Sequence, residues 1–214
     1  MNRRLLRETY HTEVDEINFT HGIPVYLKET LSGDSTSSTR DYTDPYGSHY
    51  AMHPRGSSGH GVVLMGSPLS TGVVKVIEME AIGVTVAGPV QMSLGLAHLP
   101  GDADRIQLDV VPGAAGVEYA GRAQLQVQEG DRGKAATLFA DGTLTTDLSD
   151  LDMGLFIDCG KRLAQAHVSY TWVGTEGEGF PVGKVLCPMI KGILLTDHGS
   201  PVIQVRRLRI AVYL

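Results

Sequence analysis

The last fourteen residues of the chain, Pro201 to Leu214, restrict its fold more than any other stretch. After the proline, Ile203 and Val205 fall on one face of an extended strand. The alternation slips at Arg206-Arg207 and then resumes with apolar residues from Leu208 onward, which is what a β-bulge would produce. A strand this apolar must be held inside a sheet, because an exposed apolar edge promotes aggregation. We therefore predict a long strand near the middle of a sheet, with at least one of the two guanidinium groups outside and available to an acid.

The composition predicts an aliphatic core. Hydrophobic residues make up 42% of the 214 residues, which is enough for one larger β domain, whereas aromatic residues make up only 6%. The 26 glycines and 10 prolines follow no fixed period, which is typical of many short strands joined by tight turns. We find no internal repeat in the sequence.

Charge and hydropathy argue against two classes of partner. The formal net charge is −6, and the basic residues are dispersed apart from short groups around Arg4 and Arg207, so the chain lacks the basic surface of a nucleic-acid binder. No uncharged apolar run is long enough to cross a bilayer. Acidic residues in Glu8 to Ile17 replace the apolar run of a secretory signal. We expect a protein that is soluble where it is made, with neither nucleic acid nor membrane as a partner.

The first sixty residues differ from the rest of the chain in composition and periodicity. Apolar residues within 2–17 recur at helical spacing, but Thr9 to Val14 also favours a strand, so this stretch allows either a short helix or a strand. Residues Thr30 to Gly61 are rich in Gly, Ser and polar side chains and bury too little apolar surface to offset the entropy of ordering. We predict that residues 1–60 form a largely extended N-terminal arm.

The remaining residues, 61–214, have the pattern of strands throughout. Clean period-two alternation occurs around 90–97, 105–110 and 123–128, and turn residues separate these segments. No helical period is long enough to cover a sheet face. We predict an all-β fold, an antiparallel two-sheet sandwich or jelly roll with the extended N-terminal arm attached.

Two local predictions concern the second half of the chain. Val168, Tyr170 and Trp172 alternate with polar residues, which predicts one strand with Trp172 packed inside. The Asp141-Gly142 pair lies between two strand candidates and is the strongest hairpin signal in the sequence.

The patterns that could carry catalytic or metal chemistry have simpler structural explanations. His49 and His53 have a zinc-site spacing, but Gly47 and Pro54 argue against the helix that such a site needs. The Asp-His-Gly-Ser run at 197–200 is too short for a catalytic triad, whose members meet from separate elements. Calcium binding at the acidic, glycine-rich turn 174–179 stays an alternative to a plain flexible turn. Solvated acids explain the remaining carboxylate cluster, which comprises Asp147, Asp150, Asp152 and Asp158.

The two cysteines, Cys159 and Cys187, match no C-x-x-C metal or redox spacing. A single disulfide is one alternative, and two buried free thiols are the one that we favour in a chain of this length. We expect no cofactor, no metal and no catalytic residue.

A polar arm followed by an aliphatic, glycine-rich β module resembles the accessory virion proteins of tailed phages, such as capsid decoration or cement proteins and other head or tail components. The resemblance rests on the arm Leu31 to Gly61 and on the strand series Val62 to Leu214. It implies a non-enzymatic structural protein that is synthesised as soluble protein in the host cytoplasm and is then assembled into the virion. It also implies homo-oligomers and other virion proteins as partners.

Contacts between copies are expected at the arm tyrosines Tyr42, Tyr46 and Tyr50 and at the terminal-strand pair Arg206 and Arg207. The alternative hypothesis is a ligand- or receptor-binding β module that recognises carbohydrate or protein through loops at one end of the sandwich. An enzyme on a β scaffold ranks last, because each catalytic pattern has a simpler explanation.

Overall fold

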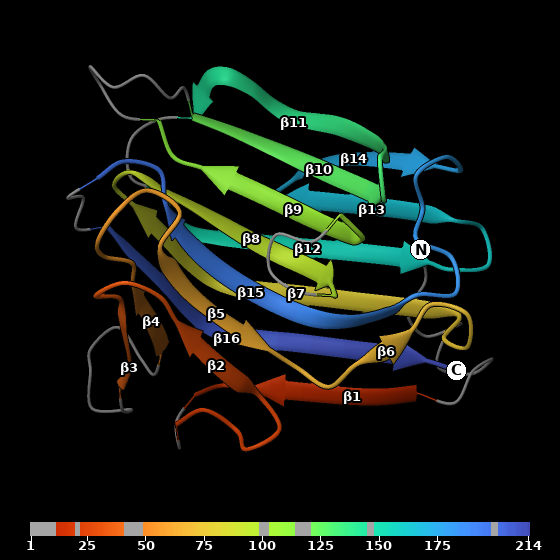
Figure 1. Cartoon of the computed structure of the whole chain (residues 1–214), viewed down its shortest axis with the longest axis horizontal. Helices are drawn as coiled ribbons and strands as arrows, with labels where there is room; N and C mark the ends of the chain where they lie inside the picture. The colour runs from red at the N-terminus through yellow and green to blue at the C-terminus, as the bar shows by residue number, and fades with distance from the viewer. Residues whose placement is uncertain are drawn as a thin grey trace.

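The computed structural model of the chain describes residues 12–19, 22–40, 49–98, 103–113, 121–144, 148–197 and 201–214. Within these ranges every regular element is a β-strand, and the strands pair antiparallel in two sheets, A and B. The two sheets form two stacked layers (Figure 1). The predicted all-β sandwich is confirmed.

Sheet A contains eight strands in the order β14-β13-β12-β7-β16-β4-β3, with β1 also paired to β16. Their bounds are β1 Thr12–Ile17, β3 Thr36–Arg40, β4 His49–His53, β7 Val76–Ala87, β12 Leu148–Asp158, β13 Leu163–Val168, β14 Thr171–Glu176 and β16 Val202–Tyr213.

Sheet B also contains eight strands, in the order β11-β10-β9-β8-β15-β5-β2, with β6 paired to β15. Their bounds are β2 Lys28–Leu31, β5 Gly61–Met65, β6 Leu69–Ser70, β8 Val90–Ala97, β9 Arg105–Val111, β10 Gly121–Glu129, β11 Arg132–Leu144 and β15 Val185–Leu194.

The core lies between the two sheets and is mostly aliphatic, as predicted. Alternate residues of each strand point inward, so that Ile77 and Met79 of β7 and Leu94 and Leu96 of β8 belong to one buried cluster. The residues between them point outward. In sheet A this second set carries the polar and aromatic groups of the candidate site.

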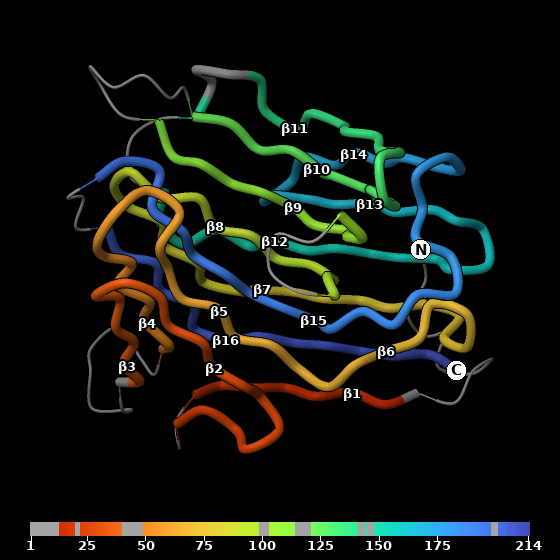
Figure 2. The backbone as a smooth tube through the Cα atoms, viewed as in Figure 1, coloured from red at the N-terminus to blue at the C-terminus, as the bar shows by residue number. Residues whose placement is uncertain are grey.

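The terminal strand β16 lies in the middle of sheet A, as predicted. It pairs along its length with β7 on one side and with β4 and β1 on the other. The first strand, drawn in red, therefore lies beside the last, drawn in blue (Figure 2). Tyr213, one residue from the end of the chain, has no exposed surface.

The pattern of β16 slips at Arg206-Arg207, where both side chains are exposed. No bulge forms there, because β7 changes side at the same level, where Gly83 adopts a φ of 62°, and the two strands stay in register. The predicted position of the bulge is therefore wrong: the register shifts in β12, between Leu148 and Met153. The predicted external guanidinium is confirmed, since Arg206 Nη1 lies 3.2 Å from Asp150 Oδ1.

The predicted arm, residues 1–60, contributes strands to both sheets in the part that the structure describes. Strands β1, β3 and β4 belong to sheet A and β2 belongs to sheet B. Residues 12–17 form a strand, while 1–11 lie outside the described residues, as do 41–48. Because β4 and β1 hydrogen-bond to β16, this segment supplies one side of the central strand.

Two local predictions are wrong. The stretch 168–172 is not one strand, because Ser169, at a φ of 52°, and Tyr170 form the turn of a hairpin between β13 and β14. The Asp141-Gly142 pair is not a turn, since β11 runs through it to Leu144 and pairs with β10 across a register shift.

Candidate functional site

A small cavity of about 80 Å³ opens on the outward face of sheet A, across strands β7, β12, β13 and β14. The period-two pattern of each strand decides which side chains reach it, because the alternate positions point into the core. The residues that line the cavity are Glu78, Met79, Glu80, Gly154, Leu155, Phe156, Gln165, His167 and Trp172. We call this region the sheet A site.

Trp172 supplies an aromatic surface at the edge of the sheet A site. It is 58% exposed and stacks on His167, with the ring centroids 4.3 Å apart and the planes inclined by 30°. In the pairing register His167 lies opposite Trp172 on one side and Gly154 on the other. The indole therefore stacks on His167 of the neighbouring strand, while much of the indole surface still faces solvent.

Gly154 makes room for the histidine ring. A Cβ at this position would come within 2.1 Å of His167 Nε2, so any larger residue would displace the ring. His167 Nδ1 lies 3.2 Å from the backbone carbonyl oxygen of Ser169. Since a carbonyl can only accept, this hydrogen bond requires the proton on Nδ1 and makes Nε2 the acceptor nitrogen of the neutral ring.

Two glutamates on β7 border the cavity on its other side. Arg209 Nη1 donates to Glu78 Oε2 at 3.2 Å and to Glu80 Oε2 at 3.3 Å, and the Tyr213 hydroxyl donates to Glu78 Oε2 at 3.1 Å. Only 6% of the Arg209 side chain is exposed, against 7% of Glu78 and 17% of Glu80. The guanidinium therefore holds both carboxylates in place.

The pKa of Arg209 reflects the same arrangement. Burial alone would lower it, but the hydrogen bond to Glu78 and the charge of Glu80 outweigh that effect and raise the pKa above its ordinary value. The guanidinium is thus a permanent positive charge beside the two glutamates.

This arrangement suits a polyhydroxylated ligand. An exposed indole offers an apolar face for stacking, and fixed carboxylate, amide and imidazole groups beside it can hydrogen-bond hydroxyl groups. The cavity is much smaller than the roughly 300–1,000 Å³ of a pocket that encloses a whole small-molecule ligand. A ligand would therefore insert one edge and lie with the rest of its length on the sheet face.

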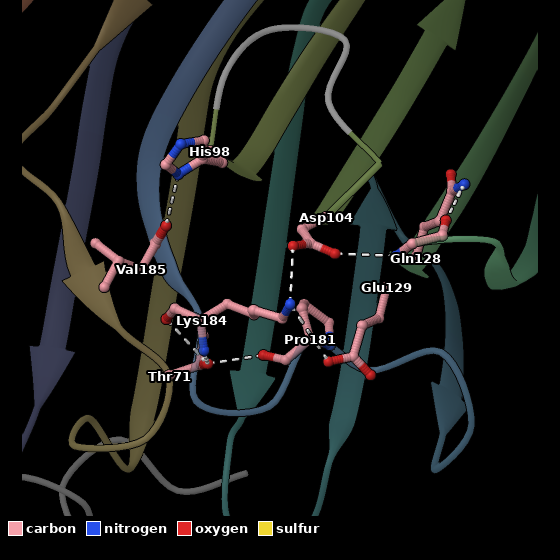
Figure 3. A network of polar contacts seen from close by, with 9 residues as sticks. Thr71, His98, Asp104, Gln128, Glu129, Pro181, Lys184 and Val185 are labelled. Atoms are coloured by element: carbon pink, nitrogen blue, oxygen red, sulfur yellow. Dashed lines mark hydrogen bonds and ion pairs between the residues drawn. The ribbon is translucent and has the colours of Figure 1, made fainter.

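A second, larger cavity of about 610 Å³ lies at one end of sheet B, where Asp104 and Lys184 meet (Figure 3). Lys184 Nζ lies 3.2 Å from Asp104 Oδ2 and 4.0 Å from Glu129 Oε1. Asp104 Oδ1 accepts a hydrogen bond from the Gly130 N–H at 2.9 Å, which is the main reason why the pKa of Asp104 is lowered. These charges pair with one another, and among the described residues no Phe, Tyr or Trp side chain lines the cavity, so the sheet A site is the stronger candidate.

Of the residues predicted at contacts between copies, Tyr50, Arg206 and Arg207 do not line the sheet A site. Tyr42 and Tyr46 lie outside the described residues. Tyr50 has no exposed surface; its hydroxyl donates to Glu29 Oε1 at 2.5 Å, and its ring lies 5.2 Å from that of Phe19. It is thus engaged inside its own chain, which leaves it no surface for a second copy.

Arg206 and Arg207 are the predicted contact residues that lie on the surface. Arg206 pairs with Asp150, and both partners are well exposed. Their role between copies stays a prediction.

The structure corrects the prediction for Trp172 and adds residues that sequence reasoning missed. Trp172 was expected inside, but the turn at Ser169-Tyr170 reverses the chain and places the indole on the outward face. No prediction from the sequence covers Glu78 and Glu80, which lie in the mostly apolar run 73–82. Their period-two spacing was the available signal.

The structure also shows where the histidine pair and the two cysteines lie. His49 and His53 lie on strand β4, and His49 is buried. Cys159 and Cys187 are both free thiols, as predicted, but only Cys159 is buried, since Cys187 is partly exposed. Burial raises the pKa of Cys159 to about 11.

The described residues also bear on metal binding and on membrane insertion. Within the described ranges no group of three or more His, Cys, Asp or Glu side chains is placed to hold a metal ion. The same part of the chain contains no helix long and apolar enough to span a membrane.

Comparisons with known proteins agree on the fold. No protein-family model and no curated protein matches the sequence. Solved structures match over nearly the whole chain. A protein of unknown function from Shewanella oneidensis MR-1 has a TM-score of 0.63 at 9% identity, covering 100% of this chain and 95% of its own.

Peanut lectin has a TM-score of 0.58 at 5% identity, with 94% and 97% of the two chains covered. The CBM2 module of the evolved Dit protein of Lactobacillus casei BL23 phage J-1 has a TM-score of 0.59 at 9% identity, with 95% and 97% covered. The similar structures are mostly lectins, carbohydrate recognition domains and glucanase-like β-sandwiches. At these identities the likeness shows the fold alone.

Proposed function

We propose that this chain is a non-enzymatic carbohydrate-binding module that recognises a glycan on the outward face of sheet A. The observation that carries the proposal is the half-exposed Trp172 beside a cavity lined by Glu80, Gln165 and His167. An aromatic platform next to fixed hydrogen-bonding groups matches the two surfaces of a sugar ring, one apolar and one rich in hydroxyls. The frequency of carbohydrate-binding proteins among structures of this fold supports it.

The alternative hypothesis derived from the sequence put recognition in loops at one end of the sandwich, whereas the proposed site lies on a sheet face. The sheet A site lies on the strands themselves, where side chains are held by the pairing register. Groups on strands are positioned more precisely than groups on loops, which reduces the entropy lost on binding. This is why we favour the sheet face over the loop-lined cavity of sheet B.

The virion hypothesis is the second candidate for the setting in which the module works. One observation favours it, the likeness of fold to a carbohydrate-binding module of a phage Dit protein. In that setting the chain would be a virion component that binds a host-surface glycan, and self-association would add avidity. Immunogold labelling of particles with antibodies against this chain tests the setting separately from the binding activity.

Replacing Trp172 tests the proposed activity. Trp172→Ala removes the stacking surface, so we expect the affinity for a glycan bound by the wild type to fall by about 30-fold, equivalent to about 2 kcal/mol. The unfolding temperature should stay unchanged, because the side chain is 58% exposed. A glycan array identifies the ligand class, and titration calorimetry with a hit from the array measures the affinity.

The matched control is Tyr170→Ala. Tyr170 is 99% exposed on the same hairpin but does not line the cavity, so its loss should change the affinity less than about twofold. Equal losses for the two variants, or full binding by Trp172→Ala, would place the carbohydrate site elsewhere. Binding of no glycan by the wild-type chain would contradict the proposed function itself.

A further inference from the structure

The geometry of the sheet A site points to one ligand class. We infer that the site takes a linear oligosaccharide lying across the strands, with its terminal unit in the cavity, and not a single sugar. This inference rests on the proposed function and goes beyond it by naming the length, the direction and the orientation of the ligand.

The first observation is the register of the outward side chains. Glu80 on β7 lies opposite Gly154 on β12, Gly154 lies opposite His167 on β13, and His167 lies opposite Trp172 on β14. Neighbouring strands are about 4.8 Å apart, so this row covers about 14 Å from the glutamate to the indole. One sugar ring cannot contact both ends of such a row, whereas an extended chain of several units can.

The second observation is the size of the cavity. Its volume of about 80 Å³ admits only an edge of one unit. Trp172 lines the cavity but remains 58% exposed, so most of its surface lies outside the cavity. The next units of a linear ligand would pass over this surface, and stacking on the indole is the contact that each of them could make.

The third observation gives the ligand a direction. Beyond β7 lies β16, whose Arg209 side chain is 6% exposed and is held by Glu78 and Glu80. On the other side β14 is the last strand in the order of sheet A. The exposed aromatic surface thus lies on the β14 side of the cavity, and we place the terminal unit of the ligand against Glu80 and its remainder over Trp172.

The experiment is a series of binding titrations with cello-, laminari- and chito-oligosaccharides of one unit up to six units. We expect the affinity of the wild-type chain for one of these series to rise about 30-fold between one unit and three or four units and then to level off. Trp172→Ala should abolish this gain with length and change the affinity for the single sugar less than about threefold.

Gln165→Ala serves as the comparison, because Gln165 lines the cavity and not the edge. This variant should weaken binding by a similar factor at every length. Equal affinity of the wild type for one unit and for six units would overturn the inference and leave the proposed function intact, as would a uniform loss in Trp172→Ala. Failure of the wild type to bind any member of the three series would contradict the inference, whereas the proposed function fails only if the wild type binds no glycan on the array.

Discussion

Two arginines on strand β16 illustrate how position in the sheet decides what a residue does. Arg206 is 49% exposed and pairs with Asp150, which is 72% exposed. Arg209, three residues further, is 6% exposed and bonds to both Glu78 and Glu80. An exposed ion pair contributes little, whereas a buried cation between two carboxylates cannot be removed without leaving uncompensated charge.

Replacing each arginine by methionine tests this contrast. Arg209→Met leaves the buried carboxylate of Glu78 and the partly exposed one of Glu80 without their cation and should lower the free energy of unfolding by about 3–5 kcal/mol. Arg206→Met should lower it by no more than about 1 kcal/mol. Guanidinium chloride denaturation of both variants provides the measurement. Similar effects of the two substitutions would show that the buried network does not stabilise the fold.

At the scale of the element, strand β16 organises sheet A. It pairs with β7 over most of its length and also with β4 and β1, so both of its edges are used. Its inward residues, which include Leu208 and Ile210, belong to the core. The neighbouring strand β7 carries the site glutamates on its outward face. Packing of its inward face in the core therefore fixes the backbone from which these glutamates project.

A charge on the inward face of β16 should prevent folding. Leu208 is 3% exposed, and Leu208→Asp would bury an unpaired carboxylate in the core. We expect loss of soluble protein on expression. Arg207→Asp, at an exposed neighbouring position, is the control and should give normal yield. Soluble, cooperatively folding Leu208→Asp protein would mean that this part of β16 is peripheral to the core.

At the scale of the whole molecule, the described part of the first sixty residues belongs to the sandwich. They supply β1, β2, β3 and β4, and their buried side chains pack in the common core, among them Ile17, Phe19, Leu27, Tyr50 and Met52. Without β1 and β4, one apolar edge of β16 would be open to pairing with other chains.

Deleting residues 1–60 should therefore destroy the native fold. We expect the fragment 61–214 to be insoluble or to lack cooperative unfolding, because it loses part of its core and bares an edge of its central strand. Solubility on expression and near-ultraviolet circular dichroism measure this. A monodisperse fragment that unfolds as cooperatively as the whole chain would instead establish residues 1–60 as a separable arm.

Periodicity alone determined much of this fold. The alternation of apolar and polar residues predicted the β class, the two-sheet sandwich, several strands and the central place of Pro201 to Leu214, because a strand with one apolar face has to bury it. Composition likewise predicted the aliphatic core and the free thiols Cys159 and Cys187.

Only the tertiary structure decided the site. A single turn at Ser169-Tyr170 moved Trp172 from a predicted core position to the surface, since a shift of one residue in a period-two pattern exchanges the two faces. Glu78, His167 and Trp172 lie on three different strands, and the pairing of β7 with β12, which is distant in sequence, brings Glu78 to the cavity that the other two line. Local pattern tells which way a side chain points within its strand, but it carries no information on which strands become neighbours.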